Sequence, residues 1–294
     1  MDEIDFTILK KLMVNCRVTY RELATMNNMS VSAIHKRIKN LVDNETISAF
    51  IARPSSIALK CISVAIFGTS NAKSMDAVSK ELGQHENVYY VLIESGKHLL
   101  ILGYLRDISS MRDYSTYISE TAQISAPIIG ITDIPYITTP ESLSTIDYKI
   151  LKTLNRDARK PVTDIADDVG ISTKTVRKRL IRMIENNLVN FTVEWTEKAE
   201  NNLTTGFHIY LKEGTSINST NQYLYEKYSE NIIICLSYSN IPNFTTMYIW
   251  TRNIQESQKI QEELQTEGFK DIIPYIALTG NSYDCWVDHL LRIK

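Results

Sequence analysis

The chain has 294 residues, which is long for one domain and suits two to four small ones. Hydrophobic residues make up 44% of it and charged residues 22%, as in an ordinary globular protein. No apolar run approaches the roughly 18–20 residues that cross a bilayer, and the N-terminus has neither a basic segment nor an apolar one. We therefore expect a cytoplasmic protein without membrane contacts.

The opening segment of the chain occurs twice. Residues 4–50 recur without a gap as residues 146–192, and twelve of the 47 aligned pairs are identical. Several other pairs exchange similar residues, such as Leu23 with Ile165 and Ile34 with Val176. A gapless repeat of this length indicates one small folded unit that is used twice.

The first copy has the pattern of three short helices. Apolar residues at helical spacing over residues 4–12 predict the first helix. Thr19 with Glu22 forms a capping box that begins the second, and Asn27–Met29 supplies a turn. Ser30 is the expected N-cap of the third helix. Two helices joined by a tight turn, with a helix before them, predict a helix-turn-helix.

The second copy follows the same plan. Gly170 stands at its turn, where glycine accepts a positive φ, and Ser172 is the expected N-cap of its third helix. A short apolar segment follows the third helix in each copy, at Ile47–Ile51 and at Val189–Val193. These segments suit the ribbon of a winged helix-turn-helix.

The third helix of each copy has a polar face opposite its apolar stripe. Lys36 and Lys178 lie at the same repeat position, at the centre of that face. Small polar residues at the start of a helix, followed by Lys and Arg, favour contacts with base edges and phosphates, whereas a solvated surface is the simpler alternative. The predicted DNA-binding residues are Ser30, Ser32, Ala33, Lys36, Arg37 and Asn40, then Ser172, Lys174, Thr175, Arg177, Lys178, Arg179 and Arg182.

Positive charge is concentrated in the repeats. The net charge of the chain is −2, yet residues 1–50 carry +1, residues 144–192 carry +4 and the remainder carries −7. This distribution favours a modular binder of double-stranded DNA whose other domains do not bind DNA. Because the two polar faces differ, we expect two non-identical half-sites, with the second copy supplying more of the affinity.

A segment of another character follows each copy. Its apolar runs alternate with helical patterns in the order βαββαβ, which is the ferredoxin-like arrangement. The first segment has expected strands at Cys61–Phe67, Val88–Ile93, Leu99–Leu105 and Ile128–Ile137, with helices at Ser74–Leu82 and Ile108–Ile118. The second has expected strands at Phe207–Leu211, Ile232–Ser237, Thr246–Trp250 and Ile272–Ala277, with helices at Thr220–Tyr228 and Ile254–Leu264.

The sequence therefore predicts an α+β chain with four domains in tandem. Winged helix-turn-helix domains are expected at residues 1–57 and 140–198, and ferredoxin-like, effector-type domains at 58–139 and 199–294. Ferredoxin-like sheets expose one apolar face, so pairing is expected either between the two halves of one chain or between chains, as a homodimer or a larger assembly.

The chain resembles the Lrp/AsnC, or feast/famine, family of transcriptional regulators. The resemblance rests on Asp5, Ile8, Leu9, Leu12, Arg17, Leu23, Ala24, Ser30, Arg37 and Ile38, and in the second copy on Asp147, Ile150, Leu151, Leu154, Asp157, Arg159, Ile165, Ala166, Gly170, Ser172, Arg179 and Leu180. It implies DNA binding, dimerisation, and a ferredoxin-like domain that binds a small effector such as an amino acid. The tandem arrangement departs from the usual single pair of domains.

The effector site is the second departure from the family. Family members often have Gly followed by Asp in the turn between the middle strands, whereas this chain has Gly96-Lys97-His98 in its first segment and no Gly in its second. The resemblance still implies that Ser95, Gly96, Lys97 and His98 are the candidate effector contacts. A solvated hairpin turn is the alternative.

Two other functions compete with a regulator. Some siroheme decarboxylases resemble the same family and place His and Arg in the ferredoxin-like half, so an enzyme is the runner-up, and a sensing or assembly module that does not bind DNA is the third. The sequence offers no nucleophile triad and no pair of catalytic carboxylates. Its four cysteines and five histidines show no metal-ligand spacing. We therefore predict no catalytic residue, cofactor or metal.

Overall fold

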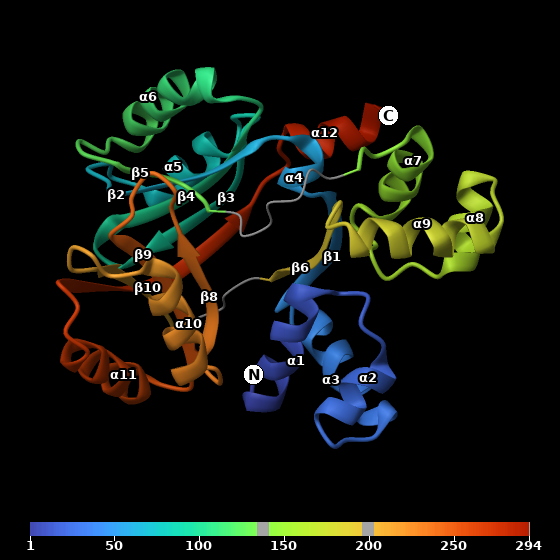
Figure 1. The fold of residues 1–294 in the computed structure, drawn as a ribbon, viewed down its shortest axis with the longest axis horizontal. Coiled ribbons are helices and arrows are strands. Elements are labelled where there is room, and N and C mark those ends of the chain that lie inside the picture. The colour runs from blue at the N-terminus through green and yellow to red at the C-terminus, as the bar shows by residue number, and fades with distance from the viewer. Residues whose placement is uncertain (134–140, 196–202, 294) are drawn as a thin grey trace. The chain divides into compact units, whose positions relative to one another are not determined.

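The structure is a computed structural model that describes residues 1–133, 141–195 and 203–293 (Figure 1). The described residues divide into two compact units. One, which we call the helical unit, contains residues 1–61, 141–195 and 284–293. The other, the sheet unit, contains residues 62–133 and 203–283. Among the described residues, no helix is both long and apolar enough to cross a membrane.

The helical unit contains both copies of the repeat. In the first copy the elements are α1 (Glu3–Val14), α2 (Tyr20–Met26), α3 (Val31–Asp43), β1 (Ile47–Pro54) and α4 (Ser56–Leu59). In the second they are α7 (Thr145–Leu154), α8 (Val162–Val169), α9 (Thr173–Glu185) and β6 (Val189–Trp195), and α12 (Trp286–Ile293) packs with them.

The helix boundaries follow the predicted capping residues. Thr19 forms the capping box of α2, and the side chains of Ser30 and Ser172 accept hydrogen bonds from backbone N–H groups in the first turns of α3 and α9. The turn residues Asn28 and Gly170 both have positive φ, at 51° and 72°. The sequence repeat is therefore also a structural repeat, with the same caps and the same turn.

The ribbon expected after each third helix forms between the copies. β1 and β6 pair with each other in a two-stranded antiparallel ladder, in which Phe50 lies opposite Val193 and Ala52 opposite Phe191. Each strand also packs against the first helix of the other copy: α1 contacts β6, and α7 contacts β1. One buried core contains residues of both copies, so the two helix-turn-helix domains are paired within a single chain.

Two arginines at equivalent repeat positions bind across this interface. The Nη1 of Arg17 donates to the backbone oxygens of Ala158 and Lys160, at 2.6 and 3.3 Å. The Nη1 of Arg159 donates to the oxygens of Cys16 and Val18, at 2.6 and 3.1 Å. All of these residues are related by the 142-residue offset of the repeat. The contact is thus a local two-fold within one chain, of the kind found in isologous dimers.

The sheet unit consists of two βαββαβ halves, as predicted. The first half contains β2 (Ile62–Thr69), α5 (Met75–Leu82), β3 (Val88–Glu94), β4 (His98–Leu105), α6 (Met111–Ala122) and β5 (Ile128–Ile131). The second contains β7 (Leu203–Tyr210), α10 (Ile217–Lys227), β8 (Ile232–Ser237), β9 (Phe244–Thr251), α11 (Ile254–Thr266) and β10 (Asp271–Ser282). The strand order is β5-β2-β4-β3-β10-β7-β9-β8, and β10 joins the halves by pairing with β7 and then with β3.

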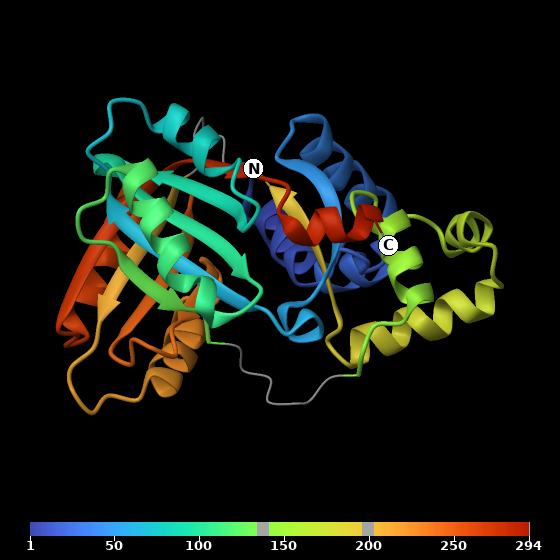
Figure 2. The ribbon, with the colours of Figure 1, turned by 90° about the horizontal axis from the view of Figure 1, so that it is seen from above.

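Alternate residues of each strand serve two different cores. On β2, Val64 and Ile66 pack toward helices α5 and α6, whereas Ala65 and Phe67 pack against residues of the second half such as Phe244. The period of two along a strand explains this division. Helices α5 and α6 cover the outer face of the first half, with α6 drawn in green across it in Figure 2. The inner faces of the halves cover each other, so the ferredoxin-like halves also pair within the chain.

Several elements differ from the sequence predictions in extent. β5 ends at Ile131, and the remainder of the strand expected up to Ile137, including Pro135, lies largely outside the described residues. β10 extends to Ser282 because its second part pairs with β3 of the other half. The C-terminal helix α12, which periodicity did not predict, groups with the helical unit.

The crossed arginine contacts predict a stability effect. Arg159 also lies over the Tyr20 ring, with its guanidinium carbon 4.6 Å from the ring centroid. Arg159→Lys keeps the charge but loses the planar group that contacts two carbonyls and stacks on the ring, so we expect a loss of about 1–2 kcal/mol in the free energy of unfolding. Urea denaturation measures it, with Arg21→Lys on the exposed surface of α2 as the matched control. Equal stability of the two variants would contradict the structural role.

Candidate functional site

The polar faces of α3 and α9 are exposed at their centres. Lys36 and Lys178 are both exposed, and within the described residues neither forms an ion pair or a hydrogen bond. Lys174 and Arg177 are exposed as well and add positive charge to α9. The first copy has no equivalent of these two, because Ser32 and His35 stand at those positions. The charge difference expected between the two copies is therefore present on their surfaces.

Three of the four arginines predicted to bind DNA, Arg37, Arg179 and Arg182, form ion pairs with carboxylates of their own domains. Arg37 forms ion pairs with Asp2 and Asp5, at 2.8 and 2.7 Å. Its repeat equivalent, Arg179, pairs with Asp147 at 3.0 Å, and Arg182 pairs with the other oxygen of Asp147 at 2.6 Å. Arg37, Arg179 and Arg182 thus connect the third helix to the first in each copy, and this engagement ranks them below the exposed lysines as phosphate ligands.

Asp147 is the centre of the second of these clusters. Its side chain is fully buried and forms the capping box of α7 with Ser144. Burial alone raises the pKa of this carboxyl, but hydrogen bonds from Ser144 and Arg179 and the charge of Arg182 outweigh burial, so the pKa lies below its ordinary value. Asp147 is therefore an anion that orients two cationic side chains of α9.

The remaining predicted DNA contacts lie on the same two helices. The N-caps Ser30 and Ser172 are exposed, and each also shares a hydrogen bond with a neighbouring hydroxyl, that of Ser32 at 3.0 Å and that of Thr175 at 2.8 Å. Ala33 is half-buried at the start of α3, and Asn40 is exposed near its end. The start of α3 therefore presents small side chains, whereas the start of α9 presents Ser172 and Thr175 beside the long side chain of Lys174.

The predicted effector contacts lie on the short turn between β3 and β4. Gly96 has φ of 68°, a conformation that glycine adopts readily. The Ser95 hydroxyl accepts a hydrogen bond from the backbone of Ile276 at 3.0 Å, and the Lys97 ammonium donates to the Ala72 carbonyl at 2.9 Å. Ser95 and Lys97 therefore stabilise the fold of the sheet unit, and their polar groups already have partners.

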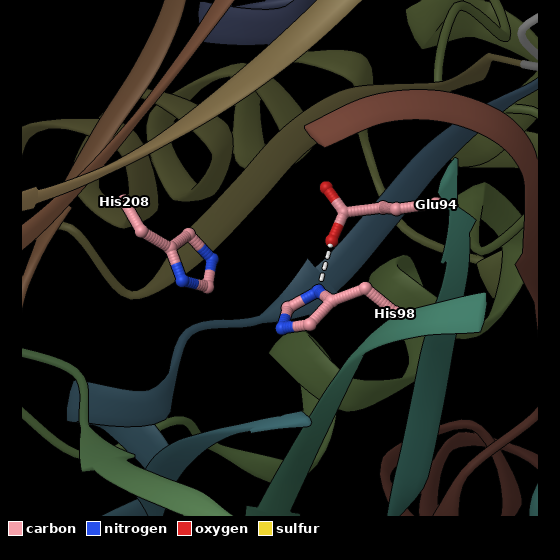
Figure 3. Close-up of side chains that lie close together, drawn as sticks. All are labelled: Glu94, His98 and His208. Carbon is pink, nitrogen blue, oxygen red and sulfur yellow. Dashed lines mark hydrogen bonds and ion pairs between the residues drawn. The ribbon is translucent and has the colours of Figure 1, made fainter. Parts of the chain in front are cut away.

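The fourth of these residues, His98, belongs to a buried polar cluster of the sheet unit. His98 approaches Glu94, and His208 of the second half faces both (Figure 3). Their exposed fractions are 4%, 0% and 1%. The distance from His98 Nδ1 to Glu94 Oε2 is 2.8 Å, and one ligating atom from each residue lies within 4.8 Å of the other two. We call Glu94, His98 and His208 the inner-face cluster.

Aromatic side chains enclose the inner-face cluster. Tyr275 stacks on His98 with ring centroids 3.8 Å apart, and the Tyr248 hydroxyl donates to Glu94 Oε1 at 3.3 Å. Burial, with a smaller contribution from nearby His98, lowers the pKa of His208 to about 3, so its imidazole is neutral at physiological pH. Burial also raises the pKa of Glu94, although the hydrogen bond with His98 opposes this shift.

The sequence pattern marks His98 as a candidate effector contact, but it does not group His98 with Glu94 and His208. His98 and Glu94 are four positions apart on two paired strands, but His208 lies 110 residues further along the chain. Their proximity arises only because the inner faces of the two halves pack together, and no local spacing reports such packing. Two polar residues in otherwise apolar strands, His98 and His208, were the available indication.

The ion pairs of Asp147 predict a pH-dependent stability. Asp147→Asn leaves Arg179 and Arg182 without their shared anion, so we expect a loss of about 2 kcal/mol at pH 7. Asp5→Asn, at the equivalent position, is the matched control and should cost less because its carboxylate is partly exposed and contacts one arginine.

The sign of the pH effect follows from the lowered pKa of Asp147. The stabilisation is complete above the ordinary aspartate pKa of about 3.9 and is lost as the pH falls through the lower value in the folded state. Urea denaturation of wild type and Asp147→Asn should therefore show a difference that is constant from about pH 7 to 5 and shrinks below about pH 4. A gap that widens at low pH would contradict this account.

Comparison with known proteins identifies the helical repeat. A model of the AsnC-type helix-turn-helix domain matches residues 1–42 and 143–184. An uncharacterised HTH-type transcriptional regulator of Pyrococcus horikoshii is 28% identical over 103 residues, which are 35% of this chain and 70% of the relative. A second such regulator, from Pyrococcus furiosus, is 25% identical over 125 residues, which are 42% and 83% of the two chains.

The fold of the whole tandem chain also has a solved counterpart. The crystal structure of the siroheme decarboxylase NirDL matches with a TM-score of 0.63 and 13% identity, over 99% of this chain and 97% of that one. At this identity the match shows a shared fold. The sequence thus contains an AsnC-type helix-turn-helix domain in each of its halves.

Proposed function

We propose that this protein is a sequence-specific transcriptional regulator that binds double-stranded DNA with two non-identical reading heads in each chain. The observation that carries the proposal is the recurrence of one surface on α3 and α9. Each helix begins at a serine N-cap that follows a tight turn, and each exposes a lysine, Lys36 or Lys178, at the centre of its outward face. The AsnC-type domains and the regulators to which the chain is similar support the same function.

Pairing of the two heads within one chain has a consequence for affinity. Once one head contacts its half-site, the other is held nearby, so two weak contacts sum to a useful affinity. Because Lys174, Arg177 and Lys178 are exposed, we infer that α9 makes most of the phosphate contacts. We infer an operator with two different half-sites, of which the one that α9 binds contributes more.

The proposal includes a small-molecule effector bound by the sheet unit, as in the effector-type domains that the chain resembles. Ser95 and Lys97 already have partners in the fold, so an effector would have to displace these contacts or use neighbouring groups. Assembly of several chains is a further part of the proposal. The inner sheet faces cover each other within the chain, so a homodimer would use another surface.

A siroheme decarboxylase activity is the second candidate, because the fold of NirDL matches the whole chain and the inner-face cluster contains two histidines and a carboxylate. The burial of that cluster weighs against it. Glu94, His98 and His208 are almost completely enclosed, so a macrocycle could not reach them unless the two halves separated. Absorption spectra of the protein with added siroheme separate the candidates, since a bound macrocycle shifts the Soret band.

The DNA proposal predicts a ranking of two lysines. Lys178→Ala should weaken operator binding several-fold, and more than Lys36→Ala, because more positive charge surrounds Lys178 and shares its contacts. If Lys178 contacts a phosphate, Lys178→Ala should also reduce the magnitude of the slope of the log association constant against log salt concentration by about 0.9. Fluorescence anisotropy on an operator chosen by in-vitro selection, over a salt series, measures both quantities.

The matched control is Lys259→Ala, which removes the same charge from the exposed surface of α11 in the sheet unit. It should leave both affinity and salt slope unchanged. Equal losses for Lys36→Ala and Lys178→Ala would contradict the ranking. Failure of the wild-type protein to retain any duplex at low salt would overturn the proposed function and favour an assembly module.

A further inference from the structure

We propose that Glu94, His98 and His208, the inner-face cluster, form a binding site for one divalent transition-metal ion of the zinc class. The three side chains come from the end of β3, the start of β4 and the middle of β7, so the site includes ligands from both ferredoxin-like halves. It goes beyond DNA binding and does not depend on it.

The donor set and its geometry support a metal ion. One ligating atom of each residue lies within 4.8 Å of the other two, and all three residues are buried. A tetrahedral ion about 2.0–2.2 Å from two imidazole nitrogens and a carboxylate oxygen needs donors roughly 3.4 Å apart, so side-chain rotation has to bring the more distant of these donors closer. Three protein ligands leave one coordination position of a tetrahedral ion for water or another small ligand.

His208 provides the strongest single indication. It is only 1% exposed, and among the described residues its Nε2 has no hydrogen-bond partner. Figure 3 shows this side of the ring directed toward Glu94 and His98. A buried nitrogen without a partner is costly, and coordination to a cation removes that cost.

Glu94 is the second indication. Its carboxylate is completely buried between the two halves of the sheet unit, where an anion without a cationic partner is unfavourable. A divalent cation beside it would supply the missing positive charge. Gly206 makes room for this carboxylate, because a Cβ at that position would lie 3.0 Å from Glu94 Oε1.

The surrounding residues suit the outer layer of a metal site. The Tyr248 hydroxyl donates to Glu94 Oε1 at 3.3 Å, which leaves the other oxygen toward His98. Tyr275 stacks on the His98 ring and fixes its plane. Partners of this kind orient ligands and tune their basicity. Two imidazoles with one carboxylate favour zinc, cobalt, nickel or copper over magnesium and calcium, which prefer all-oxygen sites.

The test uses the full-length protein, stripped with a chelator and then titrated with Co²⁺ as a spectroscopic probe for zinc. We expect one ion per chain, with the visible absorption bands of a four-coordinate site. Added Zn²⁺ should displace the Co²⁺ and abolish the bands, whereas Mg²⁺ should leave them unchanged. His208→Phe should abolish them, since phenylalanine keeps an aromatic ring against Phe67 and Phe244 but has no ligand atom.

His289→Phe is the matched control, because His289 is exposed and lies in the helical unit. It should retain full cobalt binding. Absence of stoichiometric binding by the wild type, or retention of the bands by His208→Phe, would overturn the proposal.

A second measurement needs no variant and so does not depend on folding of His208→Phe. The chain has five histidines. In nitrogen-15 spectra of the wild-type protein, one equivalent of Zn²⁺ should change the imidazole chemical shifts of two of them, His98 and His208. Changes confined to exposed histidines would contradict the assignment. Because no DNA is present in either experiment, a negative result leaves the DNA proposal unaffected.

Discussion

The antiparallel pairing of β1 with β6 is the contact on which the helical unit depends. Each copy of the repeat contributes one strand, and a lone strand has backbone N–H and C=O groups that need a partner. The other copy supplies that partner, and the exchange of α1 and α7 across the ladder buries one common core. Arg17 and Arg159 then hydrogen-bond to carbonyls of the opposite copy on both sides of the local two-fold. The two helix-turn-helix domains are therefore fixed to each other by backbone contacts within one chain.

Covalent linkage of the two copies allows them to diverge. In a homodimer every substitution occurs twice, whereas here a residue can change in one copy alone. The outward face of α9 carries Lys174 and Arg177, which have no basic equivalents of that size on α3, while the ion pairs between the third helix and the first, Arg37 with Asp5 and Arg179 with Asp147, are present in both copies. The same freedom applies to the sheet unit, where Glu94 and His98 come from one half and His208 from the other. Asymmetric sites are the chemical outcome of a tandem arrangement.

Local features of the sequence predicted most of the fold. Ser30, Ser172, Thr19 and Gly170 mark caps and turns whose physics is contained in a few neighbouring residues, and the structure confirms them. The strand periodicity gave both βαββαβ halves. What could not be predicted was which surfaces meet. An isolated apolar segment after α3 suits a wing as well as a strand paired with its repeat, and the sequence cannot show that Arg37 is engaged by Asp2 and Asp5.

The inner-face cluster buries polar groups of the sheet unit that are not fully hydrogen-bonded within it. Its neighbours Phe67, Phe244 and Tyr275 are aromatic. Burial of Glu94 and His208 costs free energy, which the hydrogen bonds of Glu94 with His98 and Tyr248 offset only in part, and His208 Nε2 has no hydrogen-bond partner among the described residues. The cost falls at the seam between the two halves, where Glu94 and His98 on one side meet His208 on the other. A cation bound there would be coordinated by ligands from both halves and would offset this cost. The affinity of the site for the cation would then depend on how the two halves pack together.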